Sequence, residues 1–171
     1  LANGTGAASN YSLNSTVINI AKRVLNSSGS KLYDANTNAL AGAITLSNLV
    51  SGEALNHSGT ATISSANVAS YTISNLTGIT IADGSGGTAS NYTLTGGTHN
   101  FTVNQRPLNA TLARQYDGTT AAAGSTLSSF DALQGGETLT MTGSGTAASA
   151  NVANGIAMSS NGNLALADGT G

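Results

Sequence analysis

The chain of 171 residues lacks much of what soluble domains ordinarily use. It has no cysteine, no tryptophan and one proline, and only 7% of its residues are charged and 4% aromatic, against about 25% charged residues in an ordinary domain. Without cysteine, a disulfide scaffold is excluded. The five basic residues do not cluster beyond Lys22–Arg23, so no nucleic-acid partner is expected. No apolar run approaches the roughly 20 residues of a membrane span.

Small polar residues take the place of the missing ones, and they favour strands. Ser, Thr and Asn side chains compete with the hydrogen bonds of a helix, whereas strands and tight turns tolerate them. Low charge would also fit a disordered chain, but a hydrophobic fraction of 39% argues against this. Apolar residues alternate at period two, which predicts half-buried strands at 16–20, 61–64, 71–73, 101–103 and 139–142.

The chain contains an internal repeat. The pair Tyr33-Asp34 returns as Tyr116-Asp117, 83 residues later. Four further matches follow in the same order: 51–55 with 135–139, 58–61 with 144–147, 66–68 with 150–152, and 81–84 with 166–169. Their separation drifts from 83 to 86 residues, so small insertions lie in loops. We conclude that two copies of one module stand in tandem.

The two ends of the chain carry related sequences. Residues 166–171 resemble residues 1–6, and Asn10-Tyr11-Ser12-Leu13 copies Asn91-Tyr92-Thr93-Leu94. The second module therefore lacks the closing segment of the first, while the beginning of the chain holds a spare copy. This predicts a chain cut out of register from a longer array. We expect residues 1–13 to close a preceding or neighbouring module, with repeats over 14–100 and 101–171.

Turn-forming clusters at 83–87 and 161–163 separate the short predicted strands. This pattern predicts an all-β fold of two tandem Ig-like or β-sandwich modules. A module of about 80 residues buries enough surface to fold only marginally, and stacking neighbours would add stability. A strand near 106–112, entered through Pro107, is expected to join the two modules.

These motifs resemble the YDG-type repeats of large bacterial hemagglutinin-like adhesins. The likeness rests on Tyr33-Asp34, on the run from Tyr116 to Ala121, and on the closing sequence at 91–94 with its copy at 10–13. The first module departs from the pattern, with Ala35-Asn36 where the family favours Gly-Thr. The resemblance implies a secreted stalk or matrix protein of Gram-negative bacteria, often used in adhesion or biofilm, from a family that is not known for catalysis.

The Tyr-Asp pairs are the sharpest candidates for a site. As a functional feature they would bind a sugar or a metal ion. The structural interpretation, which we favour, is that Tyr33 and Tyr116 enter the core while each Asp caps a turn, closed in the second copy by Gly118. The loops at 83–86 and 168–171 offer one carboxylate each, too few for calcium with its six to eight oxygen ligands, and are expected to be flexible turns.

Other groups give no support for an enzyme. His57 and His99 do not recur in the other module and are expected at the surface. No Gly-x-Ser-x-Gly elbow is present. Glu53 and Glu137 recur, but as turn residues after glycine rather than as a glycosidase pair. We expect no catalytic, cofactor or metal residues.

The leading hypothesis is an extracellular structural or adhesive repeat that forms a stalk or a head-to-tail fibre with copies of itself. In a fibre, the spare segment would be donated to the open edge of the next chain. The expected donor residues are Leu1, Tyr11, Leu13, Val17, Ile18 and Ile20. The alternative is a carbohydrate-binding module that recognises host or matrix glycans near Tyr33 or Tyr116.

Overall fold

The computed structural model describes residues 5–169, apart from the side chain of Ser74. This part of the chain contains no α-helix, which confirms the all-β prediction, and none of its helical turns is long or apolar enough to cross a membrane. Its 3-10 turns are η1 (Ala8–Asn10), η2 (Ala41–Ala43), η3 (Ala89–Asn91) and η4 (Gly124–Thr126). The strands of the first repeat are β1 (Arg23–Val24), β2 (Asn26–Leu32), β3 (Asn38–Leu40), β4 (Ile44–Ser47), β5 (Leu55–Ile63), β6 (Ala69–Asn75), β7 (Ile79–Asp83), β8 (Tyr92–Thr93) and β9 (His99–Asn104). Those of the second are β10 (Ala110–Leu112), β11 (Ala121–Ala123), β12 (Leu127–Phe130), β13 (Leu139–Thr142), β14 (Ser144–Ala147), β15 (Met158–Ser160) and β16 (Ala165–Asp168).

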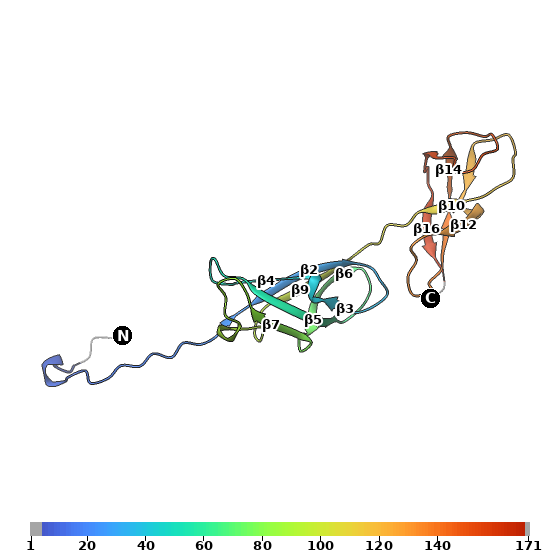
Figure 1. The fold of residues 1–171 in the computed structure, drawn as a ribbon. Helices are drawn as coiled ribbons and strands as arrows, with labels where there is room; N and C mark the ends of the chain where they lie inside the picture. Colours follow the sequence, from blue (N-terminus) through green and yellow to red (C-terminus); the bar gives the residue numbers. More distant parts are fainter. Residues whose placement is uncertain (1–4, 170–171) are drawn as a thin grey trace.

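The first repeat folds around one seven-stranded sheet in the order β3-β5-β6-β9-β2-β4, with β7 also paired to β5 (Figure 1). The pair β2–β9 is parallel and the other pairs of this sheet are antiparallel. The sheet curls into a nearly closed barrel. His57 Nε2 on β5 lies 3.1 Å from the carbonyl oxygen of Ala41 and 2.9 Å from that of Ile44, so β5 reaches the start of β4. The Ig-like topology stays a prediction.

The core of the first repeat lies on the inner face of this sheet. Phe101 and Val103 of β9 are fully buried and contact Ile63 of β5 and its neighbours. Gly29 of β2 pairs directly with Phe101, and a Cβ at Gly29 would lie 2.8 Å from the ring. The absent side chain thus makes room for the largest residue of the core.

Four of the five predicted strands are confirmed. Residues 61–64, 71–73, 101–103 and 139–142 lie mostly or entirely in β5, β6, β9 and β13. The prediction is wrong for residues 16–20, which form no strand and are exposed along their whole length. They have the right alternation, but no neighbouring strand pairs with them. β9 itself runs across the predicted boundary at residue 100 and belongs to the sheet of the first repeat.

The second repeat has the same strand register but a divided sheet. Leu139 pairs with Asp168 as Leu55 pairs with Asp83. Its strands form three separate sheets: β10-β12, β11-β14-β15 and β13-β16. β13 and β14 together correspond to β5, with Gly143 between them.

The strand partners correct one match made from the sequence. Ala39 pairs with Ala61, and its counterpart Ala122 pairs with Gly145, so the equivalent of Gly59 is Gly143 and not Gly145. Both Gly59 and Gly143 have positive φ angles, +99° and +79°. The match of 58–61 with 144–147 is therefore wrong by two residues. Both copies contain a Ser-Gly-Thr sequence, and aligning these sequences gives the wrong pairing. The positive φ angles identify Gly59 and Gly143 as the equivalent residues.

Gly59→Ala is expected to destabilise the first repeat more than Gly52→Ala does. Both glycines have positive φ, +99° and +85°, so both variants incur a similar left-handed backbone cost of about 1–2 kcal/mol. Only at Gly59 would the new Cβ meet a backbone atom, the Gly78 carbonyl oxygen at 1.9 Å, while nothing lies within 4 Å at Gly52. We expect a further loss of about 1–3 kcal/mol from this overlap. Urea unfolding of the two variants measures the difference, and equal midpoints would contradict it.

Candidate functional site

The closing segment of the first repeat, residues 89–104, is held along its length by residues distant in sequence. It begins at η3, where the Ala89 N–H donates to Asp83 Oδ1 at 2.7 Å. β8 follows and pairs in parallel with β1, and the Leu25 N–H donates to the Thr93 carbonyl at 2.8 Å. The carboxylate of Asp83, expected only in a flexible turn, therefore fixes the start of this segment.

Tyr92 anchors the middle of the closing segment. Its side chain is 3% exposed, its hydroxyl donates to the carboxylate of Glu53, and the Val50 N–H donates to the same hydroxyl at 3.1 Å. The hydrogen bond to Glu53 raises the pKa of Tyr92 above its ordinary value. Sequence reasoning treated the recurring glutamate as a turn residue only, and missed that it holds the closing tyrosine.

β9 completes the closing segment and lies between β2 and β6. His99 at its start is buried, with Nδ1 2.9 Å from Ser27 Oγ and Nε2 2.8 Å from the Leu94 carbonyl oxygen. The expectation of a surface position is wrong for His99, because it shares the inward face of β9 with Phe101 and Val103. His57 is half-buried rather than exposed.

Glu137 of the second repeat has the same local structure as Glu53 but a different partner. In both turns the glutamate N–H donates at 3.0 Å to a carbonyl three residues earlier, that of Val50 or of Gln134. The Glu137 carboxylate accepts the hydroxyl of Tyr33, which belongs to the first repeat. This bond raises the pKa of Tyr33. Arg106 Nε donates to the Tyr33 carbonyl at 2.6 Å, so this residue joins the two repeats through side chain and backbone.

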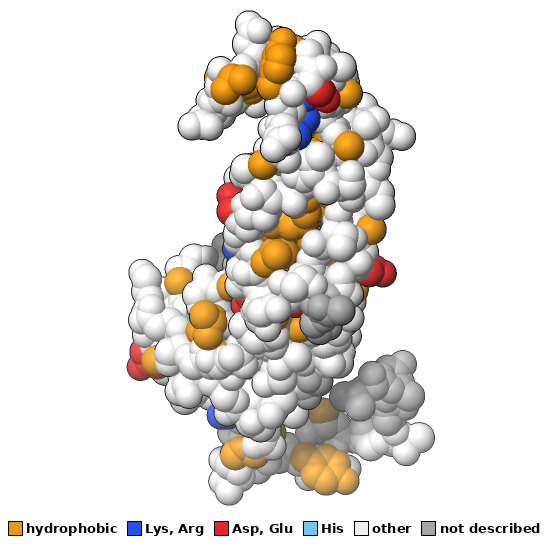
Figure 2. Space-filling model, turned by 90° about the vertical axis from the view of Figure 1, so that its right-hand side faces the viewer, with side chains coloured by type: hydrophobic (Ala, Val, Ile, Leu, Met, Phe, Trp, Pro, Cys, Tyr) orange, Lys and Arg blue, Asp and Glu red, His pale blue; other side chains and the backbone are white. Residues whose placement is uncertain are grey.

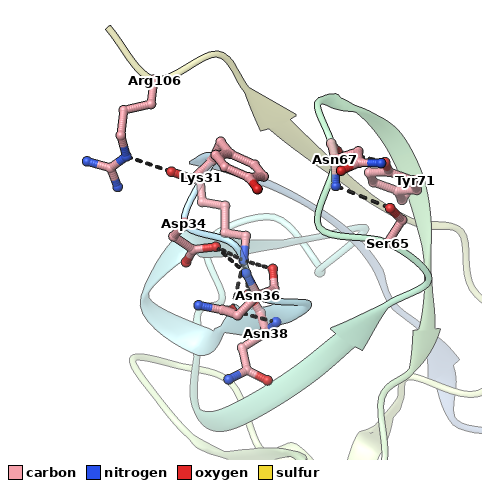
Figure 3. A network of polar contacts seen from close by, with 9 residues as sticks. Lys31, Asp34, Asn36, Asn38, Ser65, Asn67, Tyr71 and Arg106 are labelled. Atoms are coloured by element: carbon pink, nitrogen blue, oxygen red, sulfur yellow. Dashed lines mark hydrogen bonds and ion pairs between the residues drawn. The ribbon is translucent and has the colours of Figure 1, made fainter. Parts of the chain in front are cut away.

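The aspartates of the Tyr-Asp pairs cap turns. Asp34 Oδ1 accepts the Asn36 N–H at 3.2 Å and pairs with the Lys31 ammonium at 2.7 Å (Figure 3). Asp117 accepts the Thr119 N–H at 2.9 Å. Partial burial raises the pKa of Asp34, but Lys31 and the Asn36 N–H outweigh it and the net pKa is lowered.

The pKa of Asp117 is lowered chiefly by the hydrogen bonds from Thr119, and Arg114 lowers it further.

The tyrosines of the two Tyr-Asp pairs differ in burial. Tyr33 packs at the edge of the core, whereas Tyr116 is 65% exposed and does not enter it, contrary to expectation.

Two cavities in the described part of the chain involve the second repeat, and the first of them is shared with the first repeat. The first, of about 720 Å³, is lined by residues that include Tyr33, Arg106, Gln134, Glu137 and Asp168. The second, of about 800 Å³, lies between residues 110–116 and residues 149–158. Figure 2 looks at the molecule from the side of the second repeat and shows hydrophobic side chains in patches among few charged ones.

The tail that precedes β1 extends away from the first repeat (Figure 1). Within it, η1 repeats the sequence Ala-Ser-Asn of η3, and Tyr11 follows η1 as Tyr92 follows η3. Of the predicted donor residues, Leu1 lies outside the described residues. The others are largely exposed, namely Tyr11, Leu13, Val17, Ile18 and Ile20.

Comparison with known families decides what these repeats are. A YDG domain matches residues 21–100 and again residues 102–171. The chain belongs to the YDG domain family. No curated protein and no solved structure matches it. Among residues 5–169, which the structure describes, no group of three or more His, Cys, Asp or Glu side chains is placed to hold a metal ion.

Proposed function

We propose that this chain is a structural or adhesive segment of an extracellular bacterial surface or matrix protein, in which YDG domains form a stalk or a head-to-tail fibre. The observation that carries the proposal is the direct connection between the two domains. β9 of the first domain leads through residues 105–109 into β10 of the second, and the Tyr33–Glu137 bond crosses the junction. Such a connection suits modules that bear load in series.

The recurring carboxylates of the first YDG domain bind other groups of the same domain. Glu53 holds Tyr92, Asp83 holds η3, and Asp34 caps its own turn. Groups that catalyse a reaction would instead face a substrate cavity with a base and a nucleophile within reach of each other. This arrangement supports a structural function over a catalytic one.

Antibodies raised against the chain test where the protein acts. In the bacterium that encodes it, we expect them to label intact cells or the surrounding matrix, and mild protease treatment of intact cells to remove the label. A cytoplasmic marker protein should survive the same treatment. Labelling that requires lysis of the cells would overturn the proposal.

A second candidate function is the binding of glycans in the first cavity. It is favoured by the polar side chains of Arg106, Gln134, Glu137 and Asp168 beside the ring of Tyr33. A glycan array followed by calorimetry tests it, with Glu137→Gln as the variant expected to lose binding. An array on which no glycan binds would remove this candidate.

A further inference from the structure

We infer that Ala132 makes the junction between the two YDG domains a fixed joint, because it leaves Arg106 able to bind Tyr33 of the preceding domain. We use the word joint for the contacts of residues 33–35 with residues 106, 135 and 137. The inference deepens the proposed function and rests on it, because it specifies what holds one module of a stalk against the next. It follows from a difference between equivalent residues of the two domains.

Tyr33 lies at the centre of the joint. Its N–H donates at 2.9 Å to the carbonyl oxygen of Asn104, the last residue of β9. Arg106 Nε donates to the Tyr33 carbonyl oxygen at 2.6 Å (Figure 3), and the Tyr33 hydroxyl donates to Oε1 of Glu137. A carboxylate accepts several hydrogen bonds, so the contact with Tyr33 does not exclude another donor to Glu137. One residue of the first domain is thus bound by two residues that follow β9.

The backbones of the two domains also approach each other at the joint. Ala35, in the turn after Tyr33, has a φ of +59°. A Cβ placed on Gly135 would lie 3.0 Å from the Cβ of Ala35. In the first domain the equivalent of Gly135 is Ser51. The absence of a side chain at Gly135 therefore allows the two turns to lie close together.

Arg23 is the equivalent of Arg106, but it is bound within its own domain. Arg23 Nε donates to the carbonyl oxygen of Asn48 at 2.6 Å, and a terminal guanidinium nitrogen donates to Asn48 Oδ1 at 2.9 Å. Asn48 Nδ2 in turn donates to the carbonyl oxygen of Val24 at 2.6 Å. Asn48 therefore holds this arginine against the first domain through two acceptors.

The second domain offers neither acceptor in the same way. Ala132 stands in the place of Asn48, and both residues have positive φ angles, +58° and +66°. Ala132 has no side-chain oxygen, and its carbonyl oxygen accepts Nε2 of Gln134 at 2.9 Å. The equivalent of Gln134 in the first domain is Val50, which has no side-chain amide to donate.

These differences decide which domain the arginine binds. Arg106 cannot be held as Arg23 is, and it donates to Tyr33 of the preceding domain instead. A guanidinium always carries its charge and has five N–H donors, so it binds the acceptors within its reach. A hydrogen bond that involves a charged group shifts an equilibrium by about 10- to 100-fold. The partner of Arg106 therefore has a large effect on whether the joint is held.

Ala132→Asn is expected to release the joint. It gives Arg106 the side-chain acceptor that Asn48 provides for Arg23, so the guanidinium can bind its own domain. Asparagine adopts positive φ more readily than alanine, so the second domain should not lose folding stability. The matched control is Ala132→Gly, because glycine also adopts this φ but adds no acceptor.

Double electron–electron resonance between two nitroxide labels measures the joint. The chain has no cysteine, so Thr45→Cys on β4 and Ser129→Cys on β12 place labels at two exposed sites and nowhere else. For the labelled chain, and for Ala132→Gly in it, we expect one narrow distribution of distances. For Ala132→Asn we expect a broad distribution, with the ratio of held to released joints lowered about 10- to 100-fold.

Tyr33→Phe tests the contact with Glu137 in the same labelled chain. It keeps the ring at the edge of the core and removes the hydroxyl that donates across the joint, so the distribution should again broaden. The control is Tyr71→Phe, which removes a hydroxyl that donates to the Asn67 carbonyl oxygen at 2.7 Å within the first domain. The control should keep the narrow distribution.

Urea unfolding, followed in each domain by hydrogen exchange, confirms that the variants are folded under the conditions of the distance measurement. A broad distribution in the labelled chain without further changes would overturn the inference. Equal distributions for Ala132→Asn and Ala132→Gly, or for Tyr33→Phe and Tyr71→Phe, would overturn it too. Each of these results would leave the labelling of intact cells unchanged, so failure of the joint is distinguishable from failure of the proposed function.

Discussion

Phe101→Ala is expected to remove most of the stability of the first YDG domain. The ring is 0% exposed at the centre of β9, directly opposite Gly29, which has no side chain to fill the space that the ring leaves. Truncation of a buried phenylalanine costs about 3–5 kcal/mol. Small domains are stable by about 5–15 kcal/mol, with domains of about 80 residues near the lower limit. The first domain of the variant should therefore be largely unfolded under mild denaturing conditions.

Hydrogen exchange at increasing urea concentrations, followed separately in peptides from each domain, measures this loss. The matched control is Asn100→Ala on the same strand, because Asn100 is exposed on the opposite face. It should change stability by no more than about 0.5 kcal/mol. If Phe101→Ala shifted the unfolding midpoint of the first domain no further than the control does, this would contradict the central place of β9 in the core.

A chain that carries a second copy of residues 7–20 directly after Gly171 is expected to have a more stable second domain. In the first domain β9 lies between β2 and β6. The added segment would take the equivalent place between residues 109–115 and 154–157, and would connect β10-β12 with β11-β14-β15. Each large apolar side chain that becomes buried contributes about 1.5–3 kcal/mol, so the second domain should gain several kcal/mol of stability.

Urea unfolding of this extended chain measures the gain in stability. The control has the same extension with aspartate in place of both added isoleucines, and it should not stabilise the second domain. Unchanged hydrogen exchange at residues 154–157 in the extended chain would show that the second domain does not accept this segment.

The candidate site was only partly predictable from the sequence. The Tyr-Asp pairs and the closing Asn-Tyr sequence stand out because each is a short motif that occurs twice in the chain. Glu53 and Glu137 were underestimated, because their partners lie far away along the chain, at Tyr92 and Tyr33. The sequence does show that the complete first module contains both the recurring glutamate and the closing tyrosine. Their contact could not be derived from it, since spacing along the chain does not determine distance in space.

The sequence by itself determined the repeat, the all-β class and the alternation of the strands, because these depend on neighbouring residues and on composition. Only the tertiary structure decided which alternating segments become strands. Residues 16–20 and β9 have closely similar patterns, yet β9 lies between β2 and β6 while residues 16–20 have no partner. The physical reason is that a strand obtains its hydrogen bonds and buried face from other segments, so its formation depends on which neighbours the fold brings beside it.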